Sequence, residues 1–110
     1  NQIKQLDYLP ESLEQLDCSN NFITELDHLP RNLSFLCCDN NPINQLEHLP
    51  STIETILCYD THIEHIYNKP QNIKYIFIHP RYKYLDELKN KYPNVRISSD
   101  DYINFEEFNF

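Results

Sequence analysis

The chain has 110 residues, with 17 Asp and Glu against 9 Lys and Arg and a net charge of -8 at pH 7. Binding to the phosphate backbone of DNA or RNA needs a basic surface, so this balance excludes nucleic acid as the expected partner. No apolar run approaches the ~18 residues that cross a bilayer, and no signal-peptide pattern opens the chain, so we expect no membrane partner.

Residues 1–8 match the second half of a unit that recurs along the chain. Asn1, Ile3 and Leu6 have the spacing that is found again in each later copy. The chain therefore begins in mid-repeat. This start predicts either a fragment of a longer solenoid or a first repeat whose edge is left open.

A 20-residue unit then recurs without insertion, as full copies over residues 9–28, 29–48 and 49–68 and a degenerate copy over 69–80. A fixed period in this range predicts a solenoid, because each unit buries its apolar face only by stacking on its neighbours. We therefore assign residues 1–80 to the repeats. The recurring positions are Leu13, Leu16, Cys18, Asn21, Ile23 and Leu26, then Leu33, Leu36, Cys38, Asn41, Ile43 and Leu46, then Ile53, Ile56, Cys58, Thr61, Ile63 and Ile66.

Alternation with period two predicts one short strand in each copy. In the first copy it directs Leu16 and Cys18 inward and Gln15 and Asp17 outward. Strands of successive copies are expected to stack in parallel, about 4.8 Å apart. The Asn after each strand suits a turn, and its amide satisfies backbone groups of neighbouring loops. We expect a buried ladder of Asn1, Asn21 and Asn41 that weakens at Thr61 and Arg81.

The unit Leu-x-x-Leu-x-Cys-x-x-Asn-x-Ile resembles the signature of the leucine-rich repeat family. The 20-residue length and the Leu-Pro that opens each full copy resemble the bacterial-effector type of that family. The resemblance covers residues 1 to about 80. It implies an α/β fold, a right-handed horseshoe arc with a short parallel sheet on its concave side. Leu-Pro disfavours helix, so we expect extended or polyproline-like segments on the convex side.

Residues 81–110 are a C-terminal region in which the repeat pattern is lost. Residues 81–92 predict an amphipathic helix, and residues 95–98 predict a last strand. Together, residues 81–98 are expected to cap the last repeat. The acidic tail 100–110 is expected to pack back onto the protein or to bind a partner through some of its aromatic residues. These are Tyr102, Phe105, Phe108 and Phe110.

Cys18, Cys38 and Cys58 recur at the inward position of the repeat. A linear column of inward thiols lacks the tetrahedral convergence that zinc needs, so we interpret them as free core thiols without metal or disulfide. Reduced thiols predict an intracellular, cytoplasmic location, which is the host cytoplasm if the source is a virus or an intracellular bacterium. Cys37 occupies an outward position and is expected at solvent or at an interface. A redox role would need a lowered pKa, and no basic neighbour is obvious.

His28 and His48 share one position a repeat apart and are expected on the solvated surface, because further metal ligands are missing. No catalytic triad has a local signature, and the chain contains no Gly with which to build a phosphate loop. We therefore expect no metal, no cofactor and no enzymatic activity.

The outward strand positions give two columns, Gln15, Phe35, Thr55, Tyr75 and Asp17, Cys37, Leu57, Phe77. The first copy is polar there, whereas the later copies are apolar and aromatic. A contiguous apolar patch across several strands is typical of an interface. The alternative is that the C-terminal tail folds over the patch. The candidate partner-binding residues are Phe35, Cys37, Leu57, Tyr59, Tyr75 and Phe77.

The predicted function is a non-enzymatic protein–protein interaction module that binds a protein partner, or itself, through the concave face. The open N-terminal edge and the aromatic patch suggest homodimerisation, either side by side or concave to concave. The alternative is the substrate-recognition region of a larger effector or a ubiquitin-ligase adaptor, which the start in mid-repeat favours.

Overall fold

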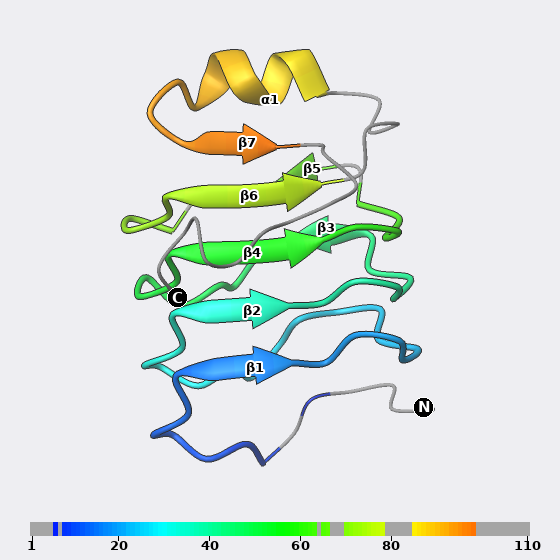
Figure 1. Cartoon of the computed structure of the whole chain (residues 1–110). Coiled ribbons are helices and arrows are strands. Elements are labelled where there is room, and N and C mark those ends of the chain that lie inside the picture. Colours follow the sequence, from blue (N-terminus) through cyan, green and yellow to red (C-terminus); the bar gives the residue numbers. More distant parts are fainter. Residues whose placement is uncertain (1–5, 7, 64, 67–69, 79–84, 99–110) are drawn as a thin grey trace.

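The 20-residue repeats form a parallel β-solenoid with little helix (Figure 1). The computed structural model describes residues 6, 8–63, 65–66, 70–78 and 85–98. Successive repeats contribute β1 (Gln15–Asp17), β2 (Phe35–Cys37), β4 (Thr55–Cys58) and β6 (Tyr75–Ile78) to one sheet, which β7 (Arg96–Ser98) completes. The strand order is β1-β2-β4-β6-β7, and all neighbours are parallel. The solenoid and its parallel sheet, both predicted from the 20-residue period, are therefore observed.

A segment that begins with Pro, preceded by Leu in three repeats and by Lys in the fourth, forms the turn by which the chain enters each strand. In four successive repeats the backbone N–H three residues after the Pro donates to the Pro carbonyl oxygen, at 3.2 or 3.3 Å. The donors are Leu13, Leu33, Ile53 and Ile73, and the acceptors are Pro10, Pro30, Pro50 and Pro70. Since the same turn recurs every 20 residues, each strand starts in register with the strand before it.

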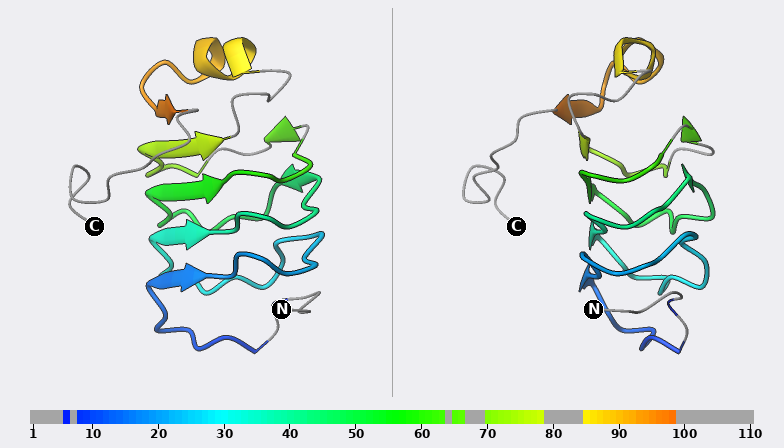
Figure 2. Two further views of the ribbon diagram at one scale, coloured as in Figure 1. Left: turned by 45° about the vertical axis from the view of Figure 1, so that its right-hand side comes forward. Right: turned by 90° about the vertical axis from the view of Figure 1, so that its right-hand side faces the viewer.

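The opposite side of the solenoid carries a second, smaller sheet. It consists of β3 (Gln45–Leu46) and β5 (His65–Ile66), which pair in parallel (Figure 2). No helix lies on this side among the described residues, in line with the expected extended conformation. The pairing itself was not predicted from the sequence.

Two series of residues with positive φ shape the remaining corners. All six φ values lie between 52° and 63°, and each series has a 20-residue spacing. Left-handed backbone suits Gly best and Asn, Asp and His next, and the chain has no Gly. An ordinary side chain costs about 1–2 kcal/mol there. Tyr8, His28 and His48 precede the Leu-Pro turns, and Asn20, Asn40 and Asp60 follow the strands.

The core lies between the two sheets and consists of inward side chains that repeat along the stack. Leu36, Ile56 and Ile76 are paired in register and are almost completely buried. Full burial of such a side chain is worth about 1.5–3 kcal/mol. The predicted alternation is therefore correct for the inward positions. Other core residues are Cys18, Ile23, Leu26, Leu33, Cys38, Ile43, Leu46, Ile53, Cys58, Ile63, Ile66, Ile73 and Ile78.

The predicted Asn ladder is present at Asn21 and Asn41, whereas Asn1 and Arg81 lie outside the described residues. The Nδ2 atom of Asn41 lies 3.0 to 3.2 Å from three backbone carbonyl oxygens of its own and the preceding repeat. Its Oδ1 accepts the N–H of Ile23 at 3.1 Å. The Thr61 side chain donates from Oγ1 to the Cys58 carbonyl oxygen at 3.0 Å. The ladder thus weakens toward the C-terminus, as expected.

The C-terminal region begins, among the described residues, with α1 (Leu85–Lys91), which lies beyond β7 at the end of the stack (Figure 1). The helix covers part of the predicted 81–92, because residues 81–84 are outside the described residues and Tyr92 follows the last turn. Its buried residue Leu88 joins the core cluster. The predicted last strand is β7. The acidic and aromatic tail lies outside the described residues.

Candidate functional site

The candidate site is the outward face of the five-stranded sheet, which we define as the face that points away from the core. The register confirms the two predicted columns. One column aligns Gln15, Phe35, Thr55, Tyr75 and Arg96, and the other aligns Asp17, Cys37, Leu57, Phe77 and Ser98. The sheet therefore brings together residues that are 20 positions apart in the sequence.

The β1 end of the outward face is polar and open to solvent. Gln15 and Asp17 are both exposed. The Oδ1 atom of Asp17 accepts the Ser19 hydroxyl at 2.6 Å and the Ser19 N–H at 3.1 Å. These hydrogen bonds from Ser19 lower the pKa of the Asp17 carboxyl. The carboxylate is thus fixed on the strand and charged at neutral pH.

The β2 region is intermediate between the two ends of the face. Phe35 and Cys37 are half-buried. The Cys37 thiol donates to Asp39 Oδ2 at 3.6 Å, and Asp39 Oδ1 accepts the Tyr59 N–H at 2.7 Å. Burial raises the pKa of Cys37 to about 12, so its thiol is protonated and a poor nucleophile. Burial likewise raises the pKa of the Asp39 carboxyl.

Two of the six candidate residues, Leu57 and Phe77, are buried although they occupy outward positions. Each is only 2% exposed, although both point away from the core. Thr55, beside them on β4, is 3% exposed. Tyr75 is half-buried, and its ring stacks on that of Phe77, with centroids 6.5 Å apart and planes at 19°. Sequence alternation gives the direction of a side chain but does not show what lies over it.

The half-buried candidates thus form a rim around a buried centre. Phe35 and Cys37 come from β2, Tyr75 from β6, and Tyr59 from the loop after β4. The four aromatic residues of the patch all have interaction partners. Asp39, the half-buried acceptor between Cys37 and Tyr59, is not among the six candidate residues. Its place in the loop that directly follows β2, close to the outward Cys37, is the sequence signal that could have identified it as an acceptor.

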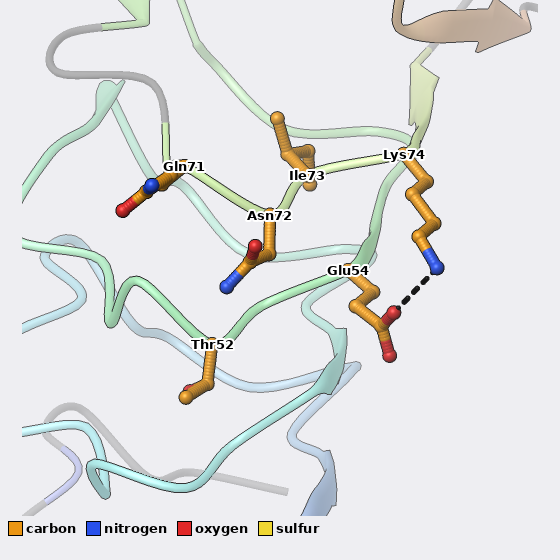
Figure 3. A pocket seen from close by; sticks show the side chains of 6 residues that line it. All are labelled: Thr52, Glu54, Gln71, Asn72, Ile73 and Lys74. Carbon is orange, nitrogen blue, oxygen red and sulfur yellow. Dashed lines mark ion pairs between the residues drawn. The ribbon is translucent and has the colours of Figure 1, made fainter.

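An open polar groove of about 390 Å³ lies on another surface, between the third and fourth repeats (Figure 3). It is lined by Thr52, Glu54, Gln71, Asn72, Ile73 and Lys74. Lys74 Nζ is paired with Glu54 Oε1 at 2.8 Å, and Asn72 Nδ2 donates to the Ser51 carbonyl oxygen at 3.0 Å. An equivalent bond in an earlier repeat joins Asn32 to the Glu11 carbonyl. These polar groups link successive repeats, so we interpret the groove as scaffold.

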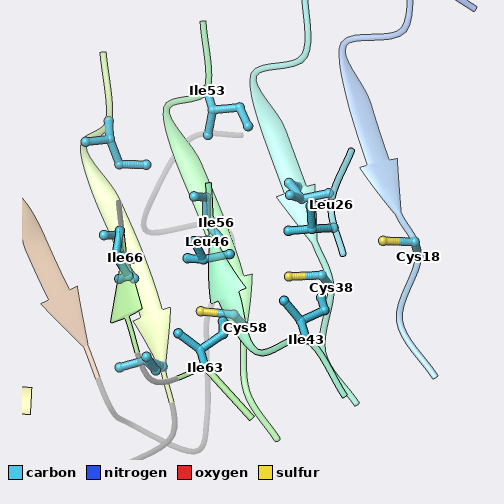
Figure 4. Packing of buried hydrophobic residues seen from close by; sticks show 14 of the residues in the cluster. Cys18, Leu26, Cys38, Ile43, Leu46, Ile53, Ile56, Cys58, Ile63 and Ile66 are labelled. Carbon is cyan, nitrogen blue, oxygen red and sulfur yellow. The ribbon is translucent and has the colours of Figure 1, made fainter. Parts of the chain in front are cut away.

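The cysteine column is part of the core, as predicted (Figure 4). All four Cys are free thiols. Cys18, Cys38 and Cys58 each donate to a backbone carbonyl oxygen of the next strand, at 3.3 or 3.4 Å. Burial raises the pKa of all three thiols, to about 12 for Cys18. They are therefore protonated core residues.

His28 and His48 are exposed, as expected, and both hold the left-handed turn before Leu-Pro. His48 Nδ1 lies 3.1 Å from Asp27 Oδ1. Among the described residues, no three His, Cys, Asp or Glu side chains gather in a way that could hold a metal ion. That part of the chain also has no helix long and apolar enough to cross a membrane.

No model of a known protein family matches this chain, and no curated protein sequence matches it.

Proposed function

We propose that this chain is a non-enzymatic protein-interaction module of the leucine-rich-repeat type. In this proposal the solenoid curves into a right-handed horseshoe, the outward face is its concave side, and α1 with β7 caps the last repeat. A protein partner, or a second copy of the chain, binds through the outward face.

The observation that supports the proposal is the half-exposed apolar rim on adjacent strands. Phe35, Cys37, Tyr59 and Tyr75 are half-buried within one chain, beside a polar and open β1 end. Aromatic residues that are partly desolvated before binding are typical of interface cores. The six candidate residues remain the proposed contact region, with Leu57 and Phe77 as its buried centre.

Charge and thiol chemistry support the same class of partner. A net charge of -8 disfavours nucleic acid, so a protein surface is the better match for an apolar and aromatic face. Four free thiols without a disulfide fit the intracellular location that we propose. The alternative, a substrate-recognition region of a larger effector or ubiquitin-ligase adaptor, stays a prediction.

The test compares Phe35→Asp with Gln15→Asp, because both residues occupy the same column and differ in their strand. Affinity capture from the source cell is followed by identification of the captured proteins. We expect Phe35→Asp to lose a partner that the parent chain and Gln15→Asp retain. Light scattering after size exclusion tests whether the partner is a second copy of the chain. We then expect Phe35→Asp to dissociate the dimer and Gln15→Asp to leave it intact. Partners and oligomeric state that are the same in all three chains would contradict the proposal.

A further inference from the structure

The outward face is accessible at β1 and β2, the two strands whose outward residues are not buried. Gln15 and Asp17 on β1 are exposed, and Phe35 and Cys37 on β2 are half-buried. On β4 the residues of the same two columns are almost completely buried. A partner that approaches the outward face therefore meets β1 and β2 first.

This accessible part of the face carries negative charge on both strands. Asp17 is in register with Cys37, and the Cys37 thiol donates to Asp39 Oδ2 at 3.6 Å. The parallel ladder continues to Asp39, because its carbonyl oxygen accepts the Asn20 N–H at 2.9 Å. Burial is the main cause of the raised pKa of Asp39, and the charge of Asp17 adds to it. The two carboxylates are therefore neighbours that repel each other.

Neither carboxylate is paired with a positive charge among the described residues. Asp17 accepts hydrogen bonds from the hydroxyl and the N–H of Ser19. Asp39 accepts from the Cys37 thiol and the Tyr59 N–H, which are neutral donors as well. The ion pairs in the described part of the chain involve the carboxylates of Glu11, Asp27 and Glu54. A cation placed beside Asp17 and Asp39 would therefore lower the electrostatic energy of both.

The spacing of the two carboxylates fits an extended segment. Asp39 is one strand and one outward position away from Asp17. Neighbouring strands are about 4.8 Å apart and two residues of a strand span about 7 Å, so the two Cα atoms are roughly 8 Å apart. Alternate side chains of an extended segment point to one side at intervals of about 7 Å. Two basic residues separated by one residue therefore match the two carboxylates.

Phe35 supplies apolar surface beside these charges. It lies two residues before Cys37 on β2, and its side chain is half-buried. Arg and Lys bury their aliphatic stems on apolar surface while their charged ends bind carboxylates, and a guanidinium forms two parallel hydrogen bonds with one carboxylate. The net charge of -8 also attracts a basic partner at long range. Charge and apolar surface thus favour the same class of ligand.

We propose that the outward face at β1 and β2 binds an extended basic segment of a partner protein, whose Arg or Lys side chains pair with Asp17 and Asp39. The inference rests on the proposed interaction function and names the chemistry of the partner. Binding at these two strands does not require Leu57 or Phe77 to become exposed.

The experiment titrates the isotope-labelled full chain with a short peptide of alternating Leu and Arg and follows the backbone amide signals. We expect the largest shifts in β1, in β2 and at Asp39. Asp17→Asn and Asp39→Asn should each weaken binding about tenfold, because each removes a charge-assisted hydrogen bond. Glu25→Gln is the matched control, since it removes one exposed carboxylate one repeat before Gln45 of β3, on the opposite side of the solenoid. Its affinity should equal that of the parent chain.

Four results would overturn the inference. The Leu-Arg peptide shifts no signal of the outward face, or a peptide of alternating Leu and Gln binds there as tightly. Glu25→Gln weakens binding as much as Asp17→Asn, which would reduce the effect to net charge. An oligomer of the chain alone that Asp17→Asn dissociates would assign the surface to a second copy. Failure of the proposed function is measured separately, from the partners and oligomeric state of the Phe35→Asp chain.

Discussion

β1 and β6 occupy equivalent places in the repeat, but their outward surroundings differ. Both direct apolar residues, Leu16 and Ile76, toward the core. On the outward face, Asp17 is exposed and bonded to Ser19, whereas Phe77 is buried. The comparison shows that the inward positions of the repeat build the same core in each copy. The outward positions are free to differ, and they divide one sheet into an open polar end and a buried apolar end.

The largest loss of stability is expected from truncation of Phe77, the large side chain that is buried at the β6 end of the outward face. Phe77→Ala should lower the free energy of unfolding by about 3–5 kcal/mol, because it removes a large side chain that is almost completely buried. Asp17→Ala, in the same column, should cost less than about 1 kcal/mol, since its side chain is exposed. Urea denaturation of both variants measures the difference. Similar losses in the free energy of unfolding at positions 77 and 17 would contradict the difference between the two ends of the outward face.

A second prediction concerns the polar ladder that joins the repeats. Asn41→Ala should cost about 2–4 kcal/mol, because it leaves several buried backbone groups without their partner. Thr61→Ala, one repeat later, removes a single bond and should cost about 1 kcal/mol. Denaturant midpoints at constant slope check this order. A larger loss for Thr61→Ala would show that the ladder does not weaken along the stack.

Substitution of a residue in a left-handed turn is expected to have a smaller effect on stability. His48→Val should cost about 1–2 kcal/mol, because a β-branched residue is poorly tolerated at a φ of 58°. His48→Asn removes the same imidazole and its contact with Asp27 but keeps a residue that accepts this backbone, so it should be close to neutral. Thermal unfolding of the two variants separates the backbone effect from the side-chain pair. Equal losses would assign the cost to the imidazole.

The smallest effects are two pH dependences of opposite sign. Hydrogen bonds from Ser19 lower the pKa of Asp17, so its contribution to stability is present above the ordinary value of 3.8 and is lost as the pH falls through the lower, folded value. Burial raises the pKa of Asp39, so the ionised group opposes folding at neutral pH, and this cost disappears as the pH falls through the raised value toward 3.8.

At neutral pH, Asp17→Asn should therefore be less stable than the parent chain and Asp39→Asn more stable, each by less than about 1 kcal/mol. The Asp39 difference should vanish below the ordinary carboxyl pKa of 3.8, whereas the Asp17 difference should vanish only below its lower, folded pKa. Urea midpoints at neutral and acidic pH measure them. Differences of the same sign at neutral pH would contradict the assigned environments.

The sequence predicted those features that depend on period and alternation alone. Leu36, Cys38 and Asn41 follow from a 20-residue repeat with inward and outward strand positions. The left-handed conformation of His48 was not predictable in this way, because Asn, Asp and His accept that backbone without requiring it. The pairing of β3 with β5 was missed because each strand has only two residues.

The burial of Leu57 and Phe77 was missed for a different reason. Their strand position is apparent from the repeat, but period and alternation give only the direction of a side chain and not its exposed fraction. Both side chains are 2% exposed although they occupy outward positions.

The central claim is that the outward face is buried at Leu57 on β4 and open to solvent at Asp17 on β1. Methyl relaxation in the unsubstituted chain, with an inert soluble paramagnetic compound added, tests this claim most directly. We predict that the Leu57 methyl groups are as protected as those of Leu36 in the core. Relaxation as fast as that of the partly buried Leu13 would show that the face at β4 is open and would contradict the account.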